Sequence, residues 1–206
     1  MTEQEKMLII YNVVIKRFTH SDQAKHNLFS NWFLWGAGKL YSPFSYIRLP
    51  ATLVEKGHSS LCSEQAYLLQ TLAESVGVQT RSAGLFGHVV MEAWYDNDWH
   101  LYDPDLEVVP LLENKNVLSL DDLARSPDQI RYFYQGRGSK EYVDSIVDII
   151  ASREDNSFVL YWMTQKHLAY RTEKIANALK WGFPVILMIM GFGLYLKNSK
   201  GNKCAV

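Results

Sequence analysis

The chain has 206 residues, of which 48% are hydrophobic and 21% are charged, and its formal net charge is −1. This size and composition indicate a globular protein with one core of moderate size. The Lys and Arg residues are scattered and the charge is near neutral, so we expect no nucleic-acid partner. The two cysteines, Cys62 and Cys204, are too few for a disulfide framework, which leaves Cys62 as a free thiol.

Residues 1–18 predict an amphipathic helix, because their apolar side chains recur at helical spacing after an acidic start. The segment lacks the basic start and the small-residue cleavage site of a signal peptide. We therefore expect a main domain that stays in the cytoplasm.

The stretch GHSSLCSEQAYLLQ places Cys62 where a loop becomes a helix. Apolar residues follow at helical spacing as far as Val76, and Gly77 is a good stop signal, so the sequence predicts a helix of about four turns. At a helix start, the unpaired N–H groups and the positive end of the helix dipole favour a thiolate over a thiol. Cys62 is either a small core side chain or, as we expect, a nucleophile.

The next segment predicts two strands and the turn between them, over residues 88–95, 96–98 and 99–103. His88 and Asp103 then lie on neighbouring antiparallel strands. A three-residue turn would put Asp103 opposite Met91, on the face that His88 does not share. We therefore expect a bulge or a shifted loop beside these residues.

Cys62, His88 and Asp103 are the residue types of a thiol-based catalytic triad. A thiol nucleophile needs a histidine as general base and acid, and that imidazole needs a carboxylate on its far nitrogen. A zinc site would require His58 and His100 to converge with Cys62 and His88 from opposite strand faces, so we expect no metal.

The run CSEQAYLLQTLAESVGVQTRSAGLFGHVVMEAWYDNDWHLYDPD carries a further pattern. A cysteine opens a helix, a Gly-Val pair ends it, and an Arg-containing strand, a Gly-His-Val strand, a Trp-bearing return strand and an Asp-Pro pair follow. This order resembles the transglutaminase-like branch of the papain-like cysteine hydrolase superfamily. The resemblance extends over residues 55–110.

The resemblance implies an α+β fold in which a helix carrying Cys62 packs on an antiparallel sheet carrying His88 and Asp103. It also implies hydrolysis, deamidation, transamidation or acyl transfer on a peptide or protein amide, with no cofactor. The alternative is a catalytically inactive transglutaminase-like fold that serves as a membrane-anchored interaction module.

Stabilisation of an oxyanion is the part of the pattern that the sequence leaves open. The backbone N–H of Cys62 supplies one donor. In the family, an upstream Gln or Trp side chain usually supplies the second. We considered Trp32 as a donor, and the substrate or oxyanion candidates are Trp35, His58 and Trp94.

The C-terminal part of the chain is helical and then strongly apolar. SLDD at 119–122 predicts a helix cap, and helices are expected over 139–152 and about 156–180. The second of these helices either packs on the catalytic domain or forms a stalk that contacts the membrane surface.

Residues 181–196 contain no charged residue and lie between Lys180 and Lys197, which predicts a C-terminal membrane anchor rather than a core helix. The basic residues on its two sides are balanced, so they barely discriminate between the two orientations. We expect a catalytic domain, a helical extension, a transmembrane helix and a polar tail over residues 1–118, 119–180, 181–196 and 197–206.

Overall fold

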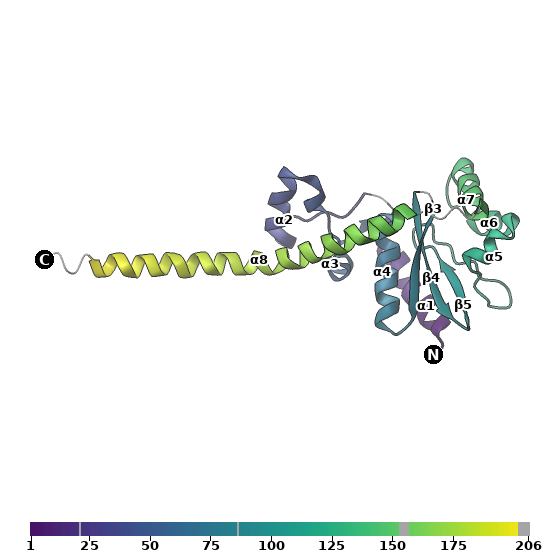
Figure 1. Ribbon diagram of the computed structural model, residues 1–206, viewed down its shortest axis with the longest axis horizontal. Helices are drawn as coiled ribbons and strands as arrows, with labels where there is room; N and C mark the ends of the chain where they lie inside the picture. The colour runs from purple at the N-terminus through teal and green to yellow at the C-terminus, as the bar shows by residue number, and fades with distance from the viewer. Residues whose placement is uncertain (21, 86, 153–156, 202–206) are drawn as a thin grey trace. The chain divides into compact units, whose positions relative to one another are not determined.

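The computed structural model describes residues 1–20, 22–85, 87–152 and 157–201 (Figure 1). The chain forms two compact units. The first, which we call the sheet unit, comprises Met1–Ala24 and Pro50–His167. The second, which we call the stem unit, comprises Lys25–Leu49 and Leu168–Val206.

The centre of the sheet unit is an antiparallel sheet in the order β3-β4-β5. Its strands are β3 (Gln79–Leu85), β4 (His88–Tyr95) and β5 (Asp98–Tyr102). Helix α1 (Glu3–Arg17) lies on one face, where the ring of Tyr11 contacts that of Tyr102. Helix α4 (Cys62–Ser75) packs against α1 and the sheet (Figure 1). The expected α+β fold class is therefore confirmed.

The opposite face of the sheet is covered by α5 (Leu120–Ala124), α6 (Pro127–Tyr134) and α7 (Lys140–Ser152). Their apolar side chains form one buried cluster with Val90 of β4 and Leu101 of β5. Leu118 belongs to the same cluster. The domain boundary expected after residue 118 thus lies inside a continuous hydrophobic core.

Local sequence signals set the ends of these helices. Thr2 and Glu5 form a capping box at the start of α1, and Ser119 and Asp122 form the expected one at the start of α5. Gly77 ends the cysteine helix with a φ of 84°, a conformation that glycine adopts without steric cost. The predicted helix from Cys62 is therefore confirmed in position and length.

The turn between β4 and β5 corrects one expectation. Asp96 and Asn97 have φ values of 49° and 67°, as a two-residue type I′ hairpin requires. Asp98 pairs with Tyr95, so the turn has two residues, Asp96 and Asn97, instead of the expected three. Of the two alternatives expected here, the structure has the shifted loop and not the bulge, because the two strands pair without interruption from this turn onward.

This register also resolves which face Asp103 occupies. Met91 pairs with Tyr102, and continuing the ladder by one residue places Asp103 opposite Val90. Val90 and His88 are two residues apart in β4, so their side chains point to the same face of the sheet. Asp103 and His88 are therefore diagonal neighbours on one face, a spacing that long side chains bridge.

Two short elements precede the cysteine helix. β1 (Thr19–His20) and β2 (Ser59–Ser60) pair in parallel, and α3 (Pro50–Lys56) lies between them in the chain. The sequence did not predict this two-residue pairing, because such short strands carry no alternation to detect.

The stem unit contains α2 (Leu28–Leu40), the short 3₁₀ helix η1 (Ser42–Ser45) and the C-terminal part of α8 (Ser157–Gly201). Glu173 of α8 is buried, and its carboxylate accepts hydrogen bonds from the backbone N–H groups of Arg48 (2.7 Å) and Leu49 (2.8 Å). The same carboxylate lies 3.3 Å from the imidazole of His26. Through Glu173, the helix predicted over about residues 156–180 thus packs on the segment 25–49.

One helix in the described chain is long and apolar enough to cross a membrane, over Tyr170–Leu196. The large apolar side chains from Trp181 to Leu196 are between 44% and 74% exposed, so they are not part of a packed core. Pro184 lies within the helix, as membrane helices tolerate. The end of the predicted polar tail, residues 202–206 with Cys204, lies outside the described residues.

Candidate functional site

Cys62 is the first residue of α4, and Leu61 before it has an extended backbone. The helix start is fixed on two sides. The carboxylate of Glu64 accepts from the N–H of Leu61 (3.3 Å) and from the side chain of Gln23 (2.6 Å), while Gln65 donates to the carbonyl of Ser60 (3.3 Å). As a first-turn residue, Cys62 has a backbone N–H without an acceptor inside the helix.

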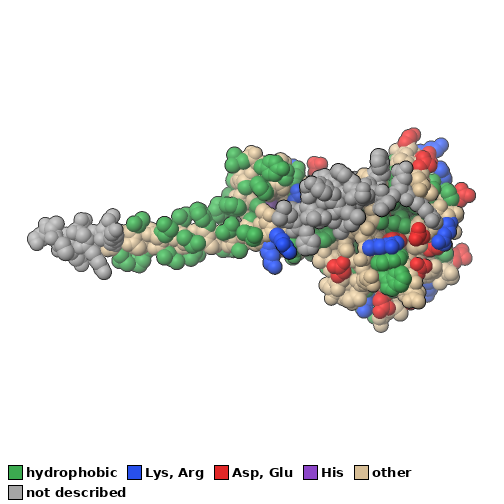
Figure 2. Space-filling model, viewed as in Figure 1, with side chains coloured by type: hydrophobic (Ala, Val, Ile, Leu, Met, Phe, Trp, Pro, Cys, Tyr) green, Lys and Arg blue, Asp and Glu red, His purple; other side chains and the backbone are tan. Residues whose placement is uncertain are grey.

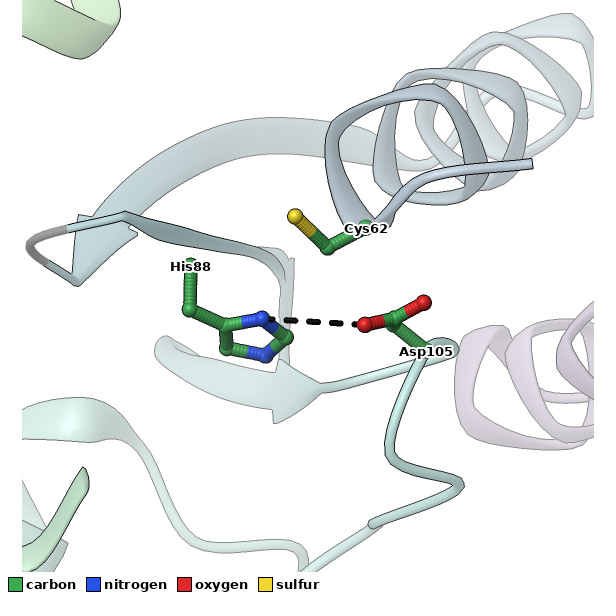
Figure 3. A group of neighbouring side chains, drawn as sticks. All are labelled: Cys62, His88 and Asp105. Carbon is green, nitrogen blue, oxygen red and sulfur yellow. Dashed lines mark ion pairs between the residues drawn. The ribbon is translucent and has the colours of Figure 1, made fainter. Parts of the chain in front are cut away.

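His88 begins β4 directly after Gly87, which has a φ of 100°, a conformation that glycine adopts without steric cost. The His88 ring is buried, and its Nε2 lies 2.7 Å from Oδ2 of Asp103. Its Nδ1 side faces Cys62 and Asp105 (Figure 3). The two ring nitrogens therefore have different partners: Nε2 faces the carboxylate of Asp103, and Nδ1 faces Cys62 and Asp105.

Asp103 follows β5 and is completely buried. Its Oδ2 accepts from His88 and from the hydroxyl of Tyr134 (3.2 Å). Its Oδ1 accepts from the backbone N–H groups of Asp105 (3.2 Å) and Leu106 (3.1 Å). With four donors, the carboxylate holds a fixed position and so fixes the His88 ring.

The backbone around Asp103 is also held from both sides. Its N–H and C=O exchange hydrogen bonds of 2.9 Å with Val108, and its C=O accepts a further bond from the hydroxyl of Tyr11 (3.2 Å). Burial and the Asp103 charge raise the pKa of the Tyr134 hydroxyl well above its ordinary value, which keeps it a donor. Tyr11 and Tyr134 come from helices on opposite faces of the sheet.

Asp105 is the member of this group that sequence reasoning missed. Its Oδ2 lies 3.8 Å from Nδ1 of His88, and its Oδ1 accepts from Gln65 (3.1 Å). The sequence held one signal, since Asp105 is the second acid of the Asp-Pro-Asp run that carries Asp103. Only the turn after β5 brings it back beside His88.

The charges around His88 favour its protonated form. Burial alone lowers the pKa of the imidazole, but the charge and hydrogen bond of Asp103, together with Cys62, raise it from 6.5 to about 10. His88 is therefore an imidazolium at neutral pH, placed between two buried carboxylates and a thiol.

Cys62, His88 and Asp105 offer a sulfur, a ring nitrogen and a carboxylate oxygen that all lie within 4.8 Å of one another. These are donor types that zinc accepts, and Asp103 on the second nitrogen of His88 would orient the ring as in a metal site. The set differs from the one considered from sequence, since His58 and His100 do not belong to it. The ring nitrogens of His100 face backbone carbonyls, of Val117 and Tyr95.

The structure does not bring two of the substrate or oxyanion candidates to this cluster. The ring of His58 is exposed and its Nδ1 lies 3.1 Å from Arg17. Trp94 lies six residues along β4 from His88, about 20 Å at the rise of a strand, and its ring packs edge-on against Trp99. Trp35 belongs to α2 of the stem unit, and its role stays a prediction.

In comparisons with known proteins, the chain matches no family model, no curated protein and no solved structure.

Proposed function

We propose that the protein is a membrane-anchored thiol enzyme that hydrolyses, or transfers the acyl group of, a peptide or protein amide. The observation that carries the proposal is the position of His88, whose two ring nitrogens face Cys62 and Asp103. A nucleophile, a base and an orienting carboxylate in this order are what acyl transfer through a thiol requires.

In this mechanism, the sulfur of Cys62 attacks the amide carbonyl carbon and the C–N bond breaks. His88 gives its Nδ1 proton to the leaving amine, so a thioester and a free amine result. Water or a second amine then attacks the thioester and loses a proton to His88, and the Cys62 thiolate leaves, which restores the starting thiolate and imidazolium. The choice between water and amine decides between hydrolysis and transfer.

The electrostatics of the cluster support a reactive thiol. A neighbouring imidazolium stabilises a thiolate, and the thiolate is the nucleophilic form. The charge of His88 is maintained by buried Asp103, so the imidazolium is available at neutral pH. Asp103 acts here through His88 and is a positioning residue.

The resemblance to transglutaminase-like cysteine hydrolases supports the same chemistry, and we propose that the sheet unit is a papain-like core of this kind. The competing proposal is an inactive fold that serves as a membrane-anchored interaction module. The two differ in the reactivity of Cys62, which is directly measurable.

Alkylation of Cys62 by iodoacetamide tests the proposal. At pH 6 we expect His88→Ala to slow the alkylation of Cys62 by about 100-fold or more, because the variant loses the imidazolium that stabilises the thiolate. The rate is followed by mass spectrometry of the Cys62 peptide from the full chain in detergent.

His58→Ala is the matched control, since this histidine is exposed and faces Arg17, and its rate should equal that of the parent. Slow alkylation that is equal in the parent and in His88→Ala would support the inactive module instead. Each rate is measured with and without a zinc chelator. A large acceleration by the chelator would mean that a metal on Cys62, His88 and Asp105 covers the thiol, and would contradict a free nucleophile.

We also propose that residues 181–196 anchor the protein in a membrane. Their large apolar side chains are exposed along α8, and no charge interrupts them between Lys180 and Lys197. In water such a surface would be unusually large for a monomer, whereas in a bilayer it is the expected lipid-facing surface.

Arginines in the middle of this segment should release the protein from membranes. Leu187→Arg with Ile189→Arg is expected to move the full chain into the carbonate-soluble fraction, because each arginine costs about 2.5 to 3.5 kcal/mol at the centre of a membrane helix. Ile9→Arg with Val13→Arg, on the exposed face of α1, should leave the distribution unchanged. A parent chain that is already soluble in carbonate would refute the anchor.

A further inference from the structure

We infer that α2 and η1 form a second membrane-contacting element that inserts its apolar side chains into the bilayer beside the α8 anchor. The inference rests on the proposed anchoring by α8 and adds an interaction surface to it. It comes from the distribution of side chains around α2, from the attachment of α2 to α8, and from the charges of residues 25–49.

The helix α2 exposes most of its large apolar side chains, whereas two of the three side chains that it buries are polar. The buried side chains are Ser30, Asn31 and Leu34. Phe29 and Leu40, by contrast, are 94% and 93% exposed. A helix on a water-soluble protein shows the opposite distribution, with its apolar stripe toward the core.

The exposed apolar surface is continuous in sequence from α2 into η1, and Figure 2 shows hydrophobic side chains gathered on α2 and along the C-terminal part of α8. We call it the α2 surface, and its large exposed side chains are Leu28, Phe29, Phe33, Trp35, Leu40, Tyr41 and Phe44. Most of these residues are aromatic, and aromatic side chains are enriched where proteins meet the headgroup region.

Four contacts attach α2 to α8 where the apolar segment begins. The side chain of Asn31 donates to that of Asn177 (2.8 Å), and the ammonium of Lys180 donates to the carbonyl of Ser30 (2.8 Å). Trp32 donates from its indole to the carbonyl of Lys180 (3.1 Å), and its ring lies 6.3 Å from that of Phe183.

Lys180 is the last charged residue before the anchor. If α8 enters the bilayer there, α2 is held at the boundary between headgroups and hydrocarbon.

The charges of the segment complement a lipid surface. Residues 25–49 contain three cationic side chains, Lys25, Lys39 and Arg48, and no Asp or Glu. The Lys39 ammonium lies over the ring of Trp35, at 5.4 Å from its centre. Cations beside interfacial aromatic rings are the arrangement of helices that lie in the headgroup layer and contact anionic lipids.

Lipid quenching of a fluorescent label tests the inference on the full chain. In a background of Cys62→Ser and Cys204→Ser, single cysteines Phe29→Cys and Leu40→Cys are labelled with bimane. The protein is reconstituted into vesicles of phosphatidylcholine and phosphatidylglycerol that contain brominated phosphatidylcholine as the quencher. Ile189→Cys marks the anchor, and Ile9→Cys marks an exposed apolar position of the sheet unit.

We expect quenching at positions 29 and 40 comparable with that at 189 and several-fold greater than that at 9. Quenching at 189 alone would overturn the inference and leave the anchor standing. An unquenched position 189 would refute the anchor and with it the inference. Labels at 29 and 40 that neither brominated lipid nor aqueous iodide quenches would mean that protein covers the α2 surface, which also overturns the inference.

Discussion

Replacing Asp103 with alanine is expected to lower the free energy of unfolding by about 3 to 5 kcal/mol, as removal of one partner from a buried charged pair does. The variant leaves the Tyr134 hydroxyl, two backbone N–H groups and the His88 imidazolium without their acceptor in a buried position. Each unpaired donor adds its own desolvation cost. Urea unfolding of the full chain in mild detergent, followed by tryptophan fluorescence, measures the change.

Asp148→Ala is the matched control, because this aspartate is exposed on α7. Its free energy of unfolding should stay within about 0.5 kcal/mol of the parent value. Equal small losses in both variants would contradict the role of Asp103 as the central acceptor.

The variant Asp103→Asn separates stability from chemistry. Its amide keeps the shape of the carboxylate but presents an N–H₂ group toward Nε2 of His88, which would then have to accept. The ring then loses its Nε2 proton and keeps the proton on Nδ1, so Cys62 faces a neutral imidazole that does not stabilise a thiolate. We expect a smaller loss of stability than in Asp103→Ala, together with alkylation of Cys62 as slow as in His88→Ala.

A second large effect is expected in the dependence of stability on pH. The pKa of His88 is about 10 in the folded protein and near 6.5 in the unfolded chain. Its stabilising contribution is therefore complete below pH 6.5 and is lost as the pH rises through about 10. Across this window, the free energy of unfolding should fall by about 1.4 kcal/mol for each pH unit.

Unfolding of the parent and of His88→Gln at pH 7, 8 and 9 measures this contribution. These values lie below the ionisation of unfolded tyrosine, so the buried tyrosines add little to the slope. The difference between the two proteins should shrink steadily as the pH rises. Two parallel curves would contradict a His88 that carries its proton through this range.

Much of the fold followed from local patterns. The strand over His88–Tyr95, the helix from Cys62 and the capping box at Ser119 all depend on residues within one element, and the structure has each of them at the predicted place. The turn after Tyr95 was predicted in place but not in length, because a two-residue turn needs two consecutive left-handed residues, Asp96 and Asn97, which residue type alone does not require.

The candidate site was predictable only in part for a related reason. Cys62, His88 and Asp103 were recognised by residue type and order, whereas Tyr11 and Tyr134 reach Asp103 from helices far away in the chain. No periodicity marks such partners.

The helix α2 shows the limit in another way. No helix was predicted over Leu28–Leu40, and only the structure places Phe29 and Leu40 on its exposed side.

The most direct test of the proposed thiol-dependent acyl transfer is to trap the acyl group on the protein. The full chain in detergent is treated with p-nitrophenyl acetate, and the site of acetylation is located by peptide mass spectrometry. Attack by Cys62 would release p-nitrophenolate and leave an acetyl thioester on the sulfur. We predict acetylation of Cys62 that neutral hydroxylamine removes and that His88→Ala abolishes. Acetyl groups on surface lysines alone, at equal levels in the parent and in His88→Ala, would contradict the account.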